Sequence, residues 1–207
     1  MKLKLSIFLF KINRRIVDFF NLHILSYFKW RGLLNKSQVF LEFGSGAKKG
    51  INGWVTVDLR GADISYDLSK GVPLPDNSVD VIYSSHMFEH IPYADLIVFI
   101  DECYRVLKDK GELSVCVPNA KLYIESYIKG ESCIHYESAY KPAMVDTDSM
   151  RDQVNYIAYM GGHHHYMFDE INLLHTLKKS SFASVTLRSF DEKIDLKSRD
   201  FESIYAL

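Results

Sequence analysis

The chain has 207 residues, 47% of them hydrophobic and 25% charged, which predicts one domain with a full core plus an appendage. Its 25 Lys+Arg residues nearly balance 26 Asp+Glu residues, for a formal net charge of -1, so the chain has no overall basic field and no nucleic-acid partner is expected. Three cysteines without CxxC spacing argue against a disulfide framework and a zinc site, and favour a reducing cytoplasm.

Residues 1–36 form a basic and aromatic segment, whose charges are almost all Lys and Arg. Apolar side chains recur at helical spacing over Ile12–Tyr27, which predicts an amphipathic helix. The helix either caps an edge of the main sheet or, with the rest of residues 1–34, lies on an anionic membrane as a peripheral anchor. The apolar run Ile7–Phe10 is too short to span a membrane, and no signal-peptide cleavage site follows it.

Residues 37–119 alternate short apolar runs with turn residues and one periodic segment. The short runs predict buried strands, and the periodic segment predicts a crossover helix between the last two of them. The expected elements are strands at 39–43, 54–58, 64–66, 79–83 and 113–117, and a helix from Pro92 to the turn at Asp109–Gly111.

The rest of the chain begins with a variable insertion around residues 120–160, which we expect on the substrate side. A helix ending at Gly130 opens the insertion, and a second helix with Asp169 as its N-cap follows it. Residues 184–189 and 201–206 read as two final strands. The chain is therefore expected to be an α/β protein with a single Rossmann-like doubly wound sheet, mostly parallel with an antiparallel final strand, built by residues 37–207.

The first strand ends in a glycine turn, Gly44-Ser45-Gly46, and the second ends at Asp58. Glycines let the backbone turn sharply and let a ligand approach where a Cβ would collide. A carboxylate can accept two hydrogen bonds from a ribose diol. Ligands of such sheets lie beyond the carboxyl ends of the strands, so the pattern predicts a ribose-containing ligand at this edge.

The chain resembles the class I S-adenosylmethionine-dependent methyltransferases in three segments, FLEFGSGAKKGINGWVTVDL, DLSKGVPLPDNSVDVIYSSHMFEHI and DECYRVLKDKGELSVCVPN. The resemblance is strong over residues 38–119 and closest to the type 11-like branch found among surface-polysaccharide biosynthesis proteins. It implies methyl transfer from S-adenosylmethionine, with S-adenosylhomocysteine as product, to a hydroxyl of a sugar nucleotide, a lipid-linked sugar or another small acceptor. A lipid, quinone or natural-product acceptor, or an inactive binding module, remains the alternative.

The resemblance also implies a set of cofactor contacts. Glu42 would orient the methionine end of the cofactor, Asp58 would hold the ribose hydroxyls, and Leu59 would lie against the adenine. The complete implied set is Glu42, Gly44, Ser45, Gly46, Asp58, Leu59, Asp67, Leu68, Ser84, Ser85 and His86.

The chain departs from the family pattern after the glycine turn. The connection from Gly46 to Trp54 is too short for the full helix that normally follows, and Lys48 stands where a third glycine is common. The helix-dipole contribution to cofactor binding is therefore not expected here. Lys48 or Lys49 is the alternative partner for the methionine carboxylate.

Glu89 and His90 follow the fourth strand, so either could serve as the base for a hydroxyl acceptor or hold a sugar hydroxyl. The alternative is that they cap the helix that begins at Pro92. No NPPY-like run follows this strand, which argues against the base-flipping amino-methylases of nucleic acids.

A run of three histidines, His163 to His165, precedes the second helix of the C-terminal part. His164 is a candidate acceptor base or substrate contact, and the competing interpretation is an exposed loop. Neighbouring side chains point in different directions, so this run alone predicts no metal site.

Overall fold

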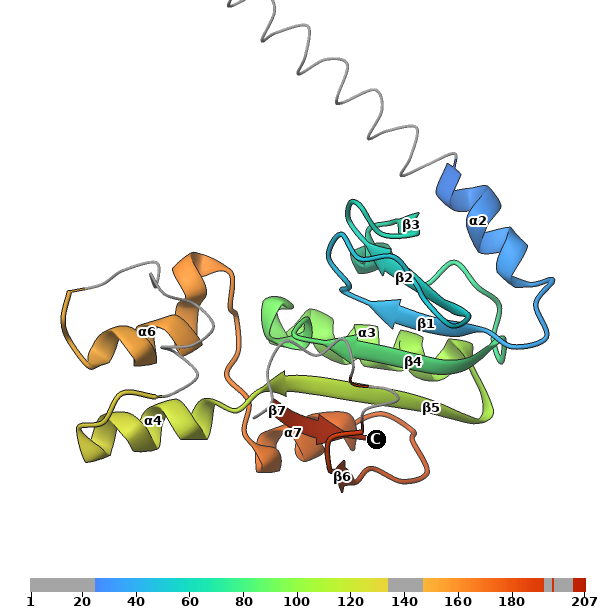
Figure 1. The fold of residues 1–207 in the computed structure, drawn as a ribbon. Helices are drawn as coiled ribbons and strands as arrows, with labels where there is room; N and C mark the ends of the chain where they lie inside the picture. Colours follow the sequence, from blue (N-terminus) through green and yellow to red (C-terminus); the bar gives the residue numbers. More distant parts are fainter. Residues whose placement is uncertain (1–24, 134–146, 192–194, 196–202) are drawn as a thin grey trace, which may run out of the picture.

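The computed structural model describes residues 25–133, 147–191, 195 and 203–207. Its centre is one sheet (Figure 1), to which the described residues contribute seven strands. In chain order these are β1 (Phe40–Phe43), β2 (Trp54–Asp58), β3 (Ile64–Ser65), β4 (Val79–Ser85), β5 (Leu107–Pro118), β6 (Leu187–Arg188) and β7 (Ser203–Ala206). Every strand expected from the sequence is present, but the one expected at 184–189 is limited to Leu187–Arg188, and residues 201–202 of the last one lie outside the described residues.

Helices and short 3-10 turns connect the strands. The helices are α2 (Ser26–Leu33), α3 (Tyr93–Val106), α4 (Ala120–Lys129), α6 (Arg151–Tyr159) and α7 (Glu170–Leu177). The 3-10 turns are η2 (Leu68–Lys70), η3 (Phe88–His90) and η4 (Met160–Gly162).

The strand order is β3-β2-β1-β4-β5-β7-β6. Strands β1 to β5 run parallel, whereas β7 is antiparallel to both β5 and β6. The predicted Rossmann-like sheet, mostly parallel with an antiparallel final strand, is therefore confirmed. From β1 the chain winds first toward β2 and later returns to β4 on the other side, and this reversal of strand order is where open α/β sheets place their ligands.

The core is built by the central strands and the crossover helix. Leu41 of β1 and Val115 of β5 are fully buried, as expected for parallel strands covered on both faces. Helix α3 ends at Val106, so the prediction that it continues to the turn at 109–111 is wrong. Leu107 is already extended and pairs with Val79 of β4, because its buried side chain and the strand pairing outweigh further helix.

Helix α2 packs onto the sheet edge. Trp30 and Leu33 are 2% and 3% exposed, and the Trp30 ring meets Tyr66 edge to face at 5.6 Å. The packing interpretation therefore holds for this described part of the N-terminal segment. Most of the helix predicted over residues 12–27 lies outside the described residues, as does the rest of the proposed membrane anchor, and the boundary at 36/37 stays a prediction. Among the residues described, no helix is long and apolar enough to cross a membrane.

Helices α4 and α6 form a lobe beyond the carboxyl end of β5 (Figure 1). The predicted helix ending at Gly130 is confirmed as α4, and Gly130 takes the left-handed conformation. The lobe has its own apolar cluster, in which Tyr123 of α4 packs with Tyr156 and Ile157 of α6. The chain then returns from the lobe to the sheet, where the His165 amide donates a hydrogen bond to the Glu89 carbonyl at 2.7 Å.

Helix α7 begins as the sequence predicts. The Asp169 carboxylate accepts from the Asn172 amide at 2.8 Å, and the Asn172 side-chain oxygen accepts from the Asp169 amide at 2.9 Å. This reciprocal capping box satisfies two amides that the helix itself leaves without partners. Leu173 and Leu177 then bury the apolar face of the helix against the sheet core.

Replacing Trp30 by alanine is expected to destabilise the protein by about 3–5 kcal/mol, because a large buried ring leaves a cavity. Phe28→Ala in the same helix is the control, since Phe28 is 65% exposed, and its cost should stay within about 0.5 kcal/mol. Urea denaturation measures the free energy of unfolding of both variants. Equal, small effects would contradict the packing of α2 as part of the core.

Candidate active site

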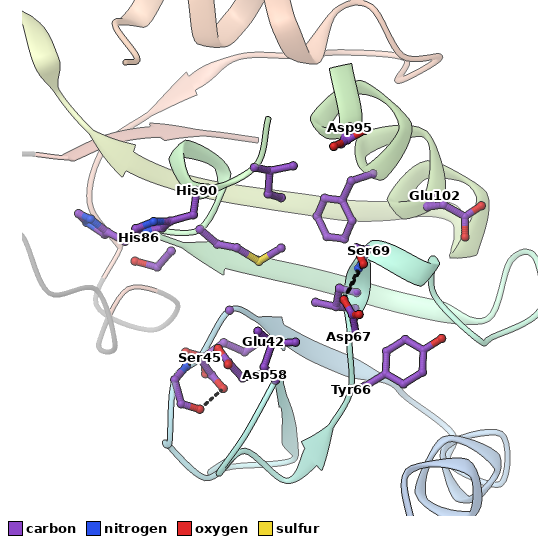
Figure 2. A pocket seen from close by; sticks show the side chains of 18 of the residues that line it. Glu42, Ser45, Asp58, Tyr66, Asp67, Ser69, His86, His90, Asp95 and Glu102 are labelled. Carbon is purple, nitrogen blue, oxygen red and sulfur yellow. Dashed lines mark hydrogen bonds between the residues drawn. The ribbon is translucent and has the colours of Figure 1, made fainter. Parts of the chain in front are cut away.

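A cavity of about 730 Å³ opens beyond the carboxyl ends of β1, β2 and β4. His86 and His90 lie at one end of it, and Tyr66 and Glu102 lie at the other (Figure 2). The volume is in the range of sites that enclose a small molecule. The structure therefore places a ligand-sized space at the edge that the sequence indicates.

All but one of the predicted cofactor contacts line this cavity. The lining ones are Glu42, Gly44, Ser45, Gly46, Asp58, Leu59, Asp67, Leu68, Ser85 and His86. Ser84 does not line the cavity and is 1% exposed. Successive side chains of a strand point to opposite faces, so Ser85 reaches the cavity and its neighbour does not.

The glycine turn joins three strand ends. Gly44 and Gly46 have φ angles of +73° and +65°, which side chains rarely tolerate. A Cβ on Gly44 would stand 2.6 Å from the Cβ of Met87, the residue after β4 and His86. The Gly46 amide donates to Oδ2 of Asp58 at 2.8 Å, which ties the turn to the end of β2.

The connection from β1 to β2 contains no helix, as its length predicts. Its conformation is fixed by Asp63, whose Oδ2 accepts from the Gly50 amide at 2.7 Å and from the Thr56 amide at 3.1 Å. Burial alone would raise the pKa of Asp63, but these hydrogen bonds lower it below its usual value. A Cβ on Gly50 would lie 1.9 Å from the Trp54 carbonyl oxygen, so the turn depends on glycine at that position too.

The two lysines of this connection differ in their placement. Lys49 Nζ donates to the Ala62 carbonyl at 2.6 Å and lies 4.0 Å from an Asp63 oxygen, so it is engaged outside the cavity. Lys48 lines the cavity. Of the two candidates for a carboxylate partner, the structure therefore brings Lys48 to the ligand space.

One wall of the cavity was not identified from the sequence. Asp95, Val98, Phe99 and Glu102 of α3 all line it. Residues spaced by three and four lie on one face of a helix, and this spacing could have identified the wall from the sequence. The apolar periodicity of Leu96, Ile100 and Cys103 predicted how the helix packs, and the neighbouring face was not assigned to the site.

Glu89 lies close to His86 and His90, which form the histidine end of the cavity, and it is 2% exposed. Burial raises the pKa of its carboxyl to about 8. Neither carboxylate oxygen has a hydrogen-bond partner among the described residues. The closest side-chain nitrogens are His86 Nδ1 at 3.6 Å and His90 Nε2 at 3.9 Å, both beyond hydrogen-bonding distance.

The interpretation of Glu89 and His90 as caps of α3 is wrong. The N-cap of that helix is Pro92, where no side-chain cap bond is present among the described residues, and neither oxygen of Glu89 is hydrogen-bonded there. His90 Nδ1 instead pairs with the His163 carbonyl at 3.0 Å. A carbonyl only accepts, so Nδ1 carries the proton and the ring is oriented by the returning chain.

The histidine run is split by burial. His164 is 7% exposed, whereas the side chains of His163 and His165 are exposed, so the exposed-loop interpretation fits only the outer two. His164 Nδ1 pairs with the Ile157 carbonyl at 2.8 Å, and its ring centre lies 4.8 Å from that of His90. Burial lowers the pKa of both rings below the ordinary histidine value, which favours neutral imidazoles.

Residues 41–115 match the family model described as a methyltransferase domain, which covers less than half of the chain. A stretch of 57 residues is 40% identical to a protein of Mycolicibacterium smegmatis named "Probable S-adenosylmethionine-dependent methyltransferase". The match covers 28% of this chain and 21% of that protein, so the chain spans about a fifth of the length of this curated relative.

Solved structures of low sequence identity are also similar. A Thermotoga maritima methyltransferase described as a "possible histamine N-methyltransferase" is 16% identical, with a TM-score of 0.49, and the match covers 100% of this chain and 98% of that one. Phosphoethanolamine N-methyltransferase 2 of Haemonchus contortus, in complex with S-adenosyl-L-methionine, is 13% identical with a TM-score of 0.46. This match covers 83% of this chain and 40% of that one. The acceptors in these names belong to those proteins. The domain match and the strand order agree on a Rossmann-like methyltransferase fold.

Gly44→Ala is expected to destabilise the protein by about 1–3 kcal/mol more than Gly53→Ala, because it adds a clash with Met87 to the backbone strain. Gly53 is a matched control: its φ is +88°, and an added Cβ would meet nothing within 4 Å. Chemical unfolding compares the two variants. An equal loss of stability would show that the close approach to Met87 does not constrain the turn.

Proposed function

We propose that this chain is an S-adenosylmethionine-dependent methyltransferase that holds its cofactor in the cavity described above. The observation that carries the proposal is the glycine turn tied to Asp58, in front of a ligand-sized cavity and inside the segment that matches the methyltransferase domain. Both features lie at the carboxyl edge of the sheet beside the reversal of strand order.

The residues present fit this cofactor. Leu59, Leu68 and Phe99 give the cavity apolar surface of the kind that accepts an adenine ring. Asp58 places a carboxylate where a ribose diol can donate two hydrogen bonds. Glu42 adds a second, buried carboxylate beside the glycine turn (Figure 2), which suits the cationic sulfonium end of the molecule.

Bound S-adenosylmethionine supplies an electrophilic methyl group to a nucleophile. The protein must then hold donor and acceptor in line, exclude water and accept the acceptor's proton. The glycine turn and Asp58 serve the first task by fixing the cofactor end of the cavity. The histidine end is where the acceptor lies in this proposal, since His86 and His90 line it.

The proposed acceptor is a hydroxyl of a small molecule, with a nucleotide-linked or lipid-linked sugar as the leading class. A hydroxyl needs a base more than a thiol or an amine does. The lone pair on Nε2 of His90 is the available base at this end, because its Nδ1 is protonated by the bond to the His163 carbonyl. The sugar class itself is supported only by the resemblance of the motifs to the polysaccharide-biosynthesis branch.

Asp58→Asn is expected to weaken binding of S-adenosylhomocysteine by about 10- to 100-fold, because it removes a charged hydrogen-bond acceptor. The asparagine oxygen can still accept from the Gly46 amide, so the turn should survive. Asp101→Asn, an exposed acid of α3 outside the cavity, is the matched control. Calorimetry measures both, and no binding by the wild type would overturn the proposal.

Turnover is tested by incubating the protein and S-adenosylmethionine with a panel of sugar nucleotides, lipid-linked sugars, quinones and small phenols. We expect a mass increase of one methylene on a hydroxyl-bearing acceptor, abolished by Asp58→Ala. Methylation of an amine only would contradict the hydroxyl proposal. Cofactor binding without product on any acceptor would favour an inactive binding module.

A further inference from the structure

We propose that Glu89, His90 and His164 form a binding site for a divalent first-row transition-metal ion at the histidine end of the cavity. One ligand atom from each of the three side chains lies within 4.8 Å of the others. The residues come from η3 and from the chain that returns after η4, so the cluster exists only in the folded protein. The backbone hydrogen bond from His165 to Glu89 holds the two segments side by side.

The carboxylate of Glu89 is the first argument for a cation. It is 2% exposed, and neither oxygen has a hydrogen-bond partner among the described residues. Asp195, also buried, shows the usual arrangement, because both of its oxygens accept from Arg188. Burying a charged carboxylate without donors is costly, so the group keeps its proton until a bound cation replaces it.

The two imidazoles provide an independent argument. Nδ1 of His90 donates to the His163 carbonyl at 3.0 Å, and Nδ1 of His164 donates to the Ile157 carbonyl at 2.8 Å. Each bond fixes a tautomer in which Nε2 keeps its lone pair. Histidines that ligate metals are typically oriented by such a bond from the other ring nitrogen. Both rings are therefore prepared as ligands.

The donor set indicates the kind of ion. Two imidazole nitrogens and one carboxylate suit Zn²⁺ and its neighbours in the first transition row, whereas Mg²⁺ and Ca²⁺ prefer oxygen ligands. Tetrahedral ligands at about 2.0–2.2 Å from an ion stand roughly 3.3–3.6 Å apart, so the 4.8 Å spread of the three side chains needs to close by about 1.2–1.5 Å. Three protein ligands leave a coordination position open.

The open position has a consequence for the reaction. His90 lines the cavity, so an ion held by the three side chains borders the space proposed for the acceptor (Figure 2). An acceptor oxygen bound there would lose its proton more readily, and to solvent water, because Nε2 of His90 is then a metal ligand and not the base. This use of the ion rests on the proposed function, whereas metal binding itself does not.

The test is titration of the metal-free full-length chain with Zn²⁺ by calorimetry and with Co²⁺ by visible absorption. The wild type should bind one ion per chain, with a cobalt spectrum of mixed nitrogen and oxygen ligation. Glu89→Gln and His164→Gln should each weaken binding by about 100-fold or more, since each removes one ligand. His90→Gln, at a half-buried position where misfolding is less of a risk, should do the same.

His163→Ala and His165→Ala are the controls, because they remove the exposed neighbours and leave the backbone contacts in place. Both should bind as the wild type does. Loss of binding in these controls with retention in Glu89→Gln would assign the metal to the surface and overturn the proposal. So would a wild type that is folded by circular dichroism and binds neither ion. Zn²⁺ binding without any binding of S-adenosylhomocysteine would support the metal site while refuting the proposed function.

Discussion

The architecture of the site depends on a close approach between two backbone segments, at the point where Gly44 meets Met87. Only a residue without a Cβ fits there, because an added Cβ would stand 2.6 Å from that of Met87. The approach brings the end of β1 against the segment that follows β4, and the bond from the Gly46 amide to Asp58 adds the end of β2. Three strand ends are thus fixed relative to one another, and their positions determine the shape of the cavity in front of them.

Two groups of residues that border the cavity are held in different ways. The glycine turn, Asp58 and Glu42 come from adjacent parallel strands, so the sheet itself holds them. The histidine end combines η3 with a chain segment that has passed through the α4–α6 lobe and returned to pair with the Glu89 backbone. In the proposed function, the cofactor contacts are therefore held by the sheet, whereas the acceptor contacts also depend on how the returning chain packs.

The sequence predicts local features such as strands and turns, but not the contacts between segments that are distant along the chain. Asp58 and the glycine turn are recognisable because the strand ends that carry them are read from short apolar runs. The end of α3 was misjudged, since Leu107 leaves the helix to pair with Val79, a contact that depends on β4. The approach of His164 to His90 could not be predicted either. It depends on how the lobe folds, and the run itself shows no periodicity that separates its buried ring from its exposed ones.

The absence of a helix after β1 affects which charges the site presents to a ligand. Asp63 stabilises the short connection through its hydrogen bonds, but no helix N-terminus is available there to bind an anion. Among the described residues that line the cavity, Lys48 is the only lysine or arginine, whereas the acids are Glu42, Asp58, Asp67, Asp95 and Glu102. A lining with many carboxylates and one ammonium complements a ligand that carries a sulfonium, an ammonium and a single carboxylate. A dinucleotide cofactor in place of S-adenosylmethionine would instead set its pyrophosphate beside these acids, and such like-charge juxtaposition opposes its binding.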